Sequence, residues 1–329
     1  SNRISAITGG LAGAGAAAIG AGVSLNEIDA NVAARMTDTQ ATSGNSVRVT
    51  ASSDSSIEAL AAGGAGAGSF ALGGSVGTNE VQSEVEALVT GSDVTAANDV
   101  DVSALNASGI RTVSGGLAGS GAAAIGAGIS LNEIESNVHA CVIDSQINSG
   151  GDVAVAATNS ASIEALAIGG AGAATFALGG SVSVNRIGGM ICSCIMDDSN
   201  VIAAGGISVT TFDASQIHAL APGLAGAGAV AIGFSVVDND TNRILKAVIS
   251  DSDVDAGNDV VVDVNSRSSH RAIAVGGALA ADVAVHPTLA GTALPWNALG
   301  GEGVVVGARR LLGQEHRQPL VVVGRGIGA

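Results

Sequence analysis

Residues 9–28 read GGLAGAGAAAIGAGVSLNEI, and residues 115–134 read GGLAGSGAAAIGAGISLNEI. Weaker versions of the same stretch lie between these two copies and after them. An isoleucine marks each copy and recurs at steps of 53, 53, 53 and 54 residues: Ile4, Ile57, Ile110, Ile163 and Ile217. An asparagine series keeps the same step: Asn26, Asn79, Asn132, Asn185 and Asn239. A fixed period of this length is typical of a solenoid, whose repeats stack on one another.

The copies also contain segments with the two-residue period of a β-strand. Apolar residues occur at i and i+2 in the pairs Val47/Val49, Val100/Val102, Val153/Val155, Ile207/Val209 and Val260/Val262. A second segment keeps small or apolar residues at Val32, Ala34 and Met36 and at their equivalents. The position between its first two residues varies freely: Ala33, Glu86, His139, Cys192 and Lys246. The comparison of copies therefore predicts an inward face and an outward face.

The repeat predicts an all-β fold, a parallel β-helix (β-solenoid) of tandem 53–54-residue repeats. Residues 57–60 (IEAL) resemble residues 85–88 (VEAL), which suggests two coils of about 26 residues in each repeat. About ten coils at about 4.8 Å would form a rod about 50 Å long. The repeat domain spans residues 1–279, with copies starting near 3, 56, 109, 162 and 216 and a degenerate sixth. Residues 280–329 depart from the pattern and are expected to form a divergent tail or cap.

Composition limits the function. The chain has 13 Lys and Arg against 29 Asp and Glu, so it lacks the basic clusters that bind nucleic acid. Aromatic residues make up only 2% of the chain, which suits thin layers packed by small side chains. Three cysteines in 329 residues are too few for a disulfide framework. Ser1 follows no initiator Met or leader, so we expect a piece of a longer protein.

The Gly/Ala segments, such as residues 63–76, are small or apolar at both alternating positions. They are expected to be strands covered on one side by the interior and on the other by a neighbouring layer or chain. Membrane helices are the alternative, because residues 112–132 carry no charge. Glycine is a poor helix former and the connecting segments are acidic, so we do not expect this fragment to span a membrane.

Several motifs of the chain carry a resemblance. Residues 163–170 read IEALAIGG, residues 179–182 read GGSV and residues 152–155 read DVAV. This pattern resembles the repeats of giant filamentous-haemagglutinin-like and autotransporter-like adhesins of Gram-negative bacteria, including leukotoxin-family filamentous adhesins, over about four-fifths of the chain. The resemblance implies a secreted β-helix beyond the outer membrane, at the cell surface, that serves cell adhesion or scaffolding. Its partner would be a receptor or polysaccharide on a host or neighbouring cell.

Cysteine and histidine pairs raise a zinc hypothesis. His139 and Cys141 correspond, one copy later, to Cys192 and Cys194. If each copy made two coils, the pairs would lie about 10 Å apart, too far for a shared zinc ion or for a Cys141–Cys194 disulfide. We therefore expect exposed or semi-exposed thiols, while a one-coil repeat would bring the pairs close.

Four acids are calcium candidates: Asp251, Asp253, Asp255 and Asp259. Alternating carboxylates can hold calcium, but Ala256 stands where an EF-hand needs glycine. Solvated turn acids are the simpler interpretation. No other cofactor is expected.

No residues suggest a catalytic site. The outward charges are scattered and Trp296 is the only tryptophan, so a sugar-stacking cleft is not expected. The sequence thus favours a non-catalytic structural or adhesive stalk segment. The alternative is a self-associating fibre or biofilm-matrix element, and a remote one is a β-helix polysaccharide-active enzyme.

Overall fold

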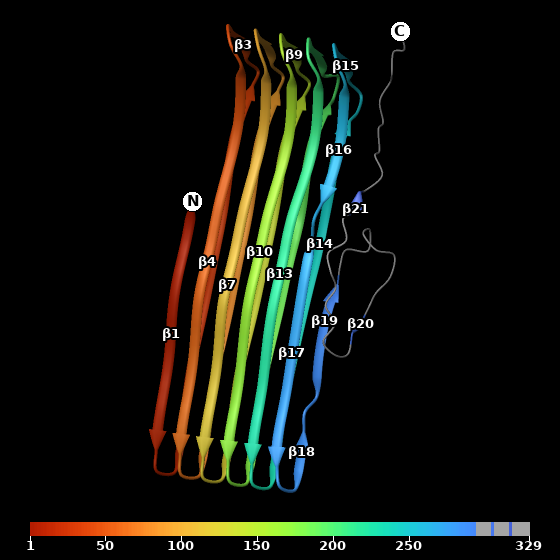
Figure 1. The fold of residues 1–329 in the computed structure, drawn as a ribbon. Coiled ribbons are helices and arrows are strands. Elements are labelled where there is room, and N and C mark those ends of the chain that lie inside the picture. The colour runs from red at the N-terminus through yellow and green to blue at the C-terminus, as the bar shows by residue number, and fades with distance from the viewer. Residues whose placement is uncertain (294–303, 306–315, 318–329) are drawn as a thin grey trace.

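The computed structural model describes residues 1–293, 304–305 and 316–317, and these form a flat stack of parallel strands (Figure 1). The fold is all-β and is a parallel β-helix, as the repeat predicts. Sheet A contains the strands β1 (Asn2–Ala14), β4 (Val47–Ala67), β7 (Val100–Ser120), β10 (Val153–Ala173), β13 (Ile207–Ala227), β16 (Val260–Ser266) and β17 (Ser269–Ala280). Sheet B contains β2 (Ala17–Thr37), β5 (Phe70–Thr90), β8 (Ala123–Ile143), β11 (Phe176–Met196), β14 (Val230–Ile249), β18 (Val283–Val285) and β19 (Thr288–Ala293).

A short third sheet, sheet C, closes one end of each coil. It contains β3 (Gln40–Ser43), β6 (Asp93–Ala96), β9 (Gln146–Ser149), β12 (Asn200–Ala203) and β15 (Asp253–Ala256). Coil 1 is thus β1–β3, coil 2 is β4–β6, coil 3 is β7–β9, coil 4 is β10–β12 and coil 5 is β13–β15. Strands β16 to β19 form coil 6. Two short antiparallel pairings join β21 (His316–Arg317) to β16 and β20 (Val304–Val305) to β19.

Each 53-residue copy makes one coil, so the expectation of two coils is wrong. Ile4 pairs with Ile57, and Ile57 pairs with Ile110 on the next strand. The similar segments 57–60 and 85–88 lie on opposite sheets of the same coil. A 21-residue strand spans about 70 Å, while six stacked strands span only about 29 Å. The described molecule is therefore a wide slab, and the expected 50 Å rod of ten coils is also wrong.

The space between sheets A and B narrows from one end to the other because the inward side chains become smaller. Next to sheet C the interior is filled by valine and isoleucine, including Val102, Val138 and Ile147. Further along, single isoleucines such as Ile134 alternate with buried serine and asparagine. At the end where β4 turns into β5, only glycine, alanine and serine point inward.

Glycine allows the two sheets to approach closely at this narrow end. A Cβ atom on Gly63 would lie 1.8 Å from the carbonyl oxygen of Gly74, on the facing sheet. A Cβ atom on Gly116 would lie 1.9 Å from the carbonyl oxygen of Ala127. Equivalent glycines recur in every coil of sheet A: Gly10, Gly63, Gly116, Gly169, Gly223 and Gly276. The glycine repeat in the sequence is thus the contact between the two sheets.

The asparagine series forms a ladder inside the slab. Each side-chain amide donates to the Oδ1 atom of the next coil over 2.8 Å, from Asn26 through Asn79, Asn132 and Asn185 to Asn239. The ladder satisfies these buried polar groups only if every coil keeps the same register. It therefore explains why the copies hold their step so strictly.

The corners between sheets B and C need a left-handed backbone. Residues with positive φ occupy this corner in coils 1 to 5: Asp38, Gly91, Asp144, Asp197, Asp198 and Asp251. Aspartate and glycine are the residues that tolerate this conformation best. Coil 4 has two such residues, which accounts for the single 54-residue step.

The stack continues past residue 279. Strands β18 and β19 pair with β14 in parallel, so residues 283–293 extend sheet B. Most of the divergent tail, including Trp296, lies outside the described residues.

Candidate functional site

The narrow end of the slab is apolar on both outer surfaces. Because glycine and alanine fill its interior, the larger aliphatic side chains of this end point outward. Five of its segments carry no charged residue: residues 7–25, 60–78, 113–131, 166–184 and 220–237. We call this region, with residues 273–289 of coil 6, the apolar end. The alternative of membrane helices is wrong, since these segments are strands joined by tight turns.

The outer surface of sheet B at the apolar end carries continuous aliphatic rows. One row runs through Ile19, Leu72, Ile125, Leu178, Ile232 and Val285. A second runs through Val23, Val76, Ile129, Val182, Val236 and Leu289. Rows of branched side chains one strand spacing apart form a ridged surface suited to packing against another layer.

The outer surface of sheet A differs, because large and small residues alternate along one row. This row runs through Leu11, Gly64, Leu117, Gly170, Leu224 and Gly277. Leu11, Leu117 and Leu224 are 89%, 58% and 53% exposed. An open trough of about 680 Å³ lies around Leu11 and Leu117 over coils 1 to 4, with a floor of glycine and alanine. The expected neighbouring layer would have to cover this trough and the ridges of sheet B.

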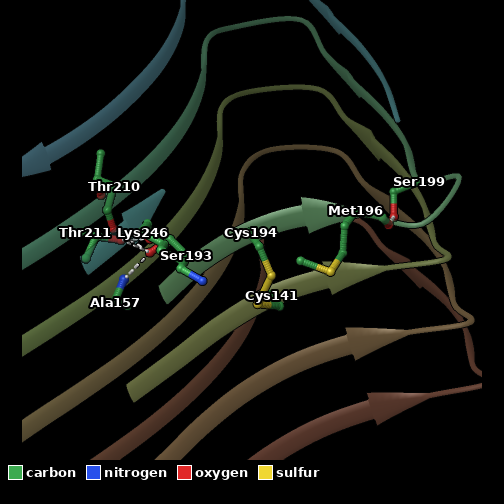
Figure 2. Close-up of a disulfide and its surroundings, with 9 residues drawn as sticks. All are labelled: Cys141, Ala157, Ser193, Cys194, Met196, Ser199, Thr210, Thr211 and Lys246. Carbon is green, nitrogen blue, oxygen red and sulfur yellow. Dashed lines mark hydrogen bonds between the residues drawn. A yellow bond between two sulfur atoms is a disulfide. The ribbon is translucent and has the colours of Figure 1, made fainter. Parts of the chain in front are cut away.

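A cluster of sulfur atoms lies on sheet B near sheet C. Cys141 and Cys194 are register partners on β8 and β11, with Cα atoms 4.6 Å apart, and they form a disulfide (Figure 2). Cys192 is the free cysteine. The sulfur atoms of Cys141, Cys192 and Cys194 all lie within 4.8 Å of one another. Met190 and Met196 pack against them.

The one-coil repeat overturns the expectations for these residues. The Cys141–Cys194 bond that seemed too long is present because neighbouring copies are neighbouring strands. The 10 Å separation assumed against a zinc site is also wrong, since His139 is the register partner of Cys192. The thiols are buried rather than exposed, and burial raises the pKa of the Cys192 thiol while Lys246 opposes that shift. In the disulfide state, two of the sulfur atoms are bonded to each other and cannot act as thiolate ligands.

Ser193, between the two cysteines, points the opposite way and holds the strand against sheet A. Its hydroxyl accepts from the Ala157 amide over 2.8 Å and donates to the Thr210 carbonyl over 2.7 Å (Figure 2). The Thr211 hydroxyl donates to the same Ser193 hydroxyl. Its Oγ1 atom also lies 2.6 Å from the carbonyl oxygen of Lys246. This buried network fixes the strand on which the sulfur cluster lies.

The four calcium candidates lie at and between the two corners of coil 5. Asp251 is the left-handed corner residue, equivalent to Gly91. Asp253 and Asp255 lie on β15, and Asp259 precedes β16. Its equivalent Asp152 accepts a hydrogen bond from the Gly206 amide over 2.7 Å. Among the described residues, only the cysteine cluster brings three or more potential ligand atoms within 4.8 Å of one another. Asp251 and Asp259 thus lie at the two corners, and Asp253 and Asp255 lie on the strand between them.

A buried ion pair and a polar hollow lie in the middle of the slab. Arg243 Nε lies 3.9 Å from Asp213 Oδ1, and both side chains are almost fully buried. Desolvation lowers the pKa of Arg243, and the nearby carboxylates of Asp213 and Glu135 oppose this shift. The guanidinium reaches past Gly189 to within 3.4 Å of the Ser136 carbonyl oxygen. Gly189 has φ 117°, and a Cβ atom added there would lie 2.1 Å from the same Ser136 carbonyl oxygen.

The polar hollow lies on the outer surface above this pair and has a volume of about 350 Å³. Glu133, Glu135, Arg186 and Asp240 line it together with two asparagines, two glycines, two isoleucines and Met190. Burial raises the pKa of Glu135, and Arg243 opposes that shift. An aromatic surface for sugar stacking is absent from this lining.

Comparison with known proteins found no matching family model, no matching curated protein and no matching solved structure. In the part of the chain that the structure describes, no helix is long and apolar enough to cross a membrane.

Sequence reasoning missed two features that the copies could have revealed. Every second copy is more similar than adjacent copies are, which gives the sequence a second period of two coils. The alternation of Leu117 with Gly64 and Gly170 follows this longer period. The buried ion pair could have been found by comparing copies. Asp213 stands where the preceding copy has Asn159, and Arg243 stands where the preceding copy has Gly189, so two opposite charges appear at inward positions of the same coil.

Proposed function

We propose that this chain is a non-catalytic stalk segment of a large secreted bacterial surface protein, which carries the adhesive parts of that protein away from the cell. The observation that supports it most is the common register that neighbouring strands keep from coil 1 to coil 5. The 21-residue strand β7, for example, pairs along its whole length with β4 and with β10. Such stacking lets each coil bury surface on both neighbours, and adding copies lengthens the stack without changing its design.

Pulling one molecule between its ends tests the stalk role. A stalk made of one-coil units should resist force and then extend in steps of about 180 Å, because one 53-residue coil releases about that length of extended chain. A chain that extends smoothly at low force, without steps of this size, would contradict a stalk. Adhesion by this segment itself is tested by coating beads with the chain and measuring their retention on glycan and cell surfaces.

A self-associating fibre or matrix element is the second candidate, and the outward aliphatic rows at the apolar end favour it. Exposed apolar surface on both sides of a slab can join molecules into layers. Sedimentation over a range of protein concentrations separates the two candidates. A stalk segment reaches a fixed mass, while a fibre element continues to grow as concentration rises.

A further inference from the structure

The trough on sheet A has a relief that matches itself. Leucine knobs lie in coils 1, 3 and 5, and glycine hollows lie between and beyond them in coils 2, 4 and 6. A two-fold rotation about an axis parallel to the strands, between coils 3 and 4, reverses the order of the coils. Coil 1 of one molecule then faces coil 6 of the other, coil 2 faces coil 5, and coil 3 faces coil 4. Every leucine knob then meets a glycine.

The facing pairs in this row are Leu11 with Gly277, Gly64 with Leu224, and Leu117 with Gly170. The neighbouring outward rows follow the same rule. On one side, the pairs are Gly9 with Val275, Ala62 with Pro222, and Gly115 with Ile168. On the other side, they are Gly13 with Leu279, Gly66 with Gly226, and Gly119 with Gly172. None of these nine pairs places two large side chains against each other, as a self-complementary two-fold interface requires. The next outward row contains Ile7, Leu60, Val113, Leu166, Leu220 and Ile273 and would place large side chains against each other, so the contact ends before it.

We propose that this surface is the contact between two copies of the chain, packed face to face through sheet A with the two-fold axis parallel to the strands. The three paired rows cover about 29 Å along the stack and about 17 Å along the strands, or about 490 Å² per copy. Stable interfaces bury about 800 Å² per partner, so we expect this smaller contact to form a weak, reversible dimer. The face carries no charged residue. Two chains that each have a net charge of −16 can therefore meet here without placing like charges in the contact.

The alternation of side-chain size distinguishes this partner from a lipid surface. Fluid acyl chains fit ridges of any spacing, so a lipid contact needs no pairing of knobs with hollows. A second copy does need it, because a slip of one coil would place leucine against leucine. This inference goes beyond the stalk role and does not depend on it.

The test is to fill the hollows. In the full chain, Gly64→Leu with Gly170→Leu places two further leucines in the trough. A Cβ atom on either glycine would approach only the Cδ2 atom of Leu11 or Leu117, at 2.7 Å, and these side-chain ends can move aside. The matched control, Thr50→Leu with Ala156→Leu, adds two leucines to the outward face of the same strands, β4 and β10, away from the trough. Circular dichroism and thermal melting verify that both variants fold.

Sedimentation equilibrium provides the measurement. We expect a concentration-dependent dimer for the unchanged chain and for the control, and a monomer for the filled variant. Leu117→Ala should weaken the dimer about 100-fold, because each dimer loses two buried leucine side chains. A chain that stays monomeric at all concentrations would overturn the inference and leave the stalk proposal intact. Equal association of the filled variant would also overturn it, because undirected hydrophobic contact does not depend on hollows.

Discussion

Gly116 and Gly119 lie three residues apart on β7 and face opposite sides of sheet A. An added Cβ at Gly116 meets the Ala127 carbonyl oxygen at 1.9 Å, while one at Gly119 meets nothing within 4 Å. Gly116→Ala should therefore force the sheets apart and lower the free energy of unfolding by about 1–3 kcal/mol, the usual cost of overpacking. Denaturant titration measures this change.

Gly119→Ala is the matched control for that experiment. It adds the same methyl group to the same strand, and it should leave stability unchanged or raise it by about 0.5 kcal/mol, because alanine restricts the unfolded chain. Equal destabilisation by both variants would mean that glycine serves backbone conformation here rather than the close approach of the sheets.

His270 introduces a pH dependence in coil 6. Its Nε2 atom lies 2.6 Å from the Thr241 hydroxyl. Burial, with a smaller contribution from His218, lowers the pKa of His270 from 6.5 to about 4. The unfolded chain therefore takes up this proton first as the pH falls, so the stabilisation is complete above pH 6.5 and is lost between about pH 6.5 and 4.

Between pH 7.5 and 5, this residue should reduce the free energy of unfolding by at most about 2 kcal/mol. The measurement is urea unfolding at the two pH values for the unchanged chain and for His270→Gln, which keeps a hydrogen-bonding group beside Thr241. The variant should lose less stability on acidification. The same loss in both proteins would assign the pH dependence to other groups.

At the level of strands, the disulfide between β8 and β11 connects coils 3 and 4. Cys141→Ala removes this link across a 53-residue loop, so we expect the free energy of unfolding to fall by about 2–4 kcal/mol. Cys192→Ala also removes a buried sulfur from the same cluster but keeps the link, and its effect should be smaller. Thermal melting of both variants, with and without a thiol reductant, makes the comparison. If reductant lowers the melting temperature of the Cys141→Ala protein as much as that of the unchanged chain, the stability lost on reduction does not come from this disulfide.

The strands also explain which parts of the structure could be predicted. The period and the inward positions of residues such as Val85 follow from alternation that every copy repeats. The number of coils per copy does not, because segments 57–60 and 85–88 face the same interior from opposite sheets and have similar sequences for that reason. Ordinary strands of about 5–6 residues also favour short coils, whereas β5 has 21 residues. The errors about Cys141, Cys194 and His139 all followed from this one misjudged length.

Across the whole slab, the position of apolar side chains reverses. Next to sheet C, valine and isoleucine fill the interior and charged pairs such as Arg48–Asp101, at 3.2 Å, lie outside. At the apolar end, glycine lies inside and leucine outside. Both ends show a two-residue alternation of side-chain type, and this alternation predicts a strand in either case. It does not show whether the larger or the smaller residues face inward at the apolar end.

The stack should also lose structure from its ends. Each coil contacts only its neighbours, so coils 3 and 4 are covered on both sides, whereas β1 pairs with β4 alone. We expect amide hydrogen exchange to be slowest in β7, β8, β10 and β11 and to become faster toward β1 and β17, with the disulfide adding to the protection of the centre. Hydrogen-exchange mass spectrometry at several denaturant concentrations resolves this gradient. Uniform protection that disappears in a single transition would instead indicate one cooperative unit, in which the asparagine ladder and glycine contacts couple all the coils.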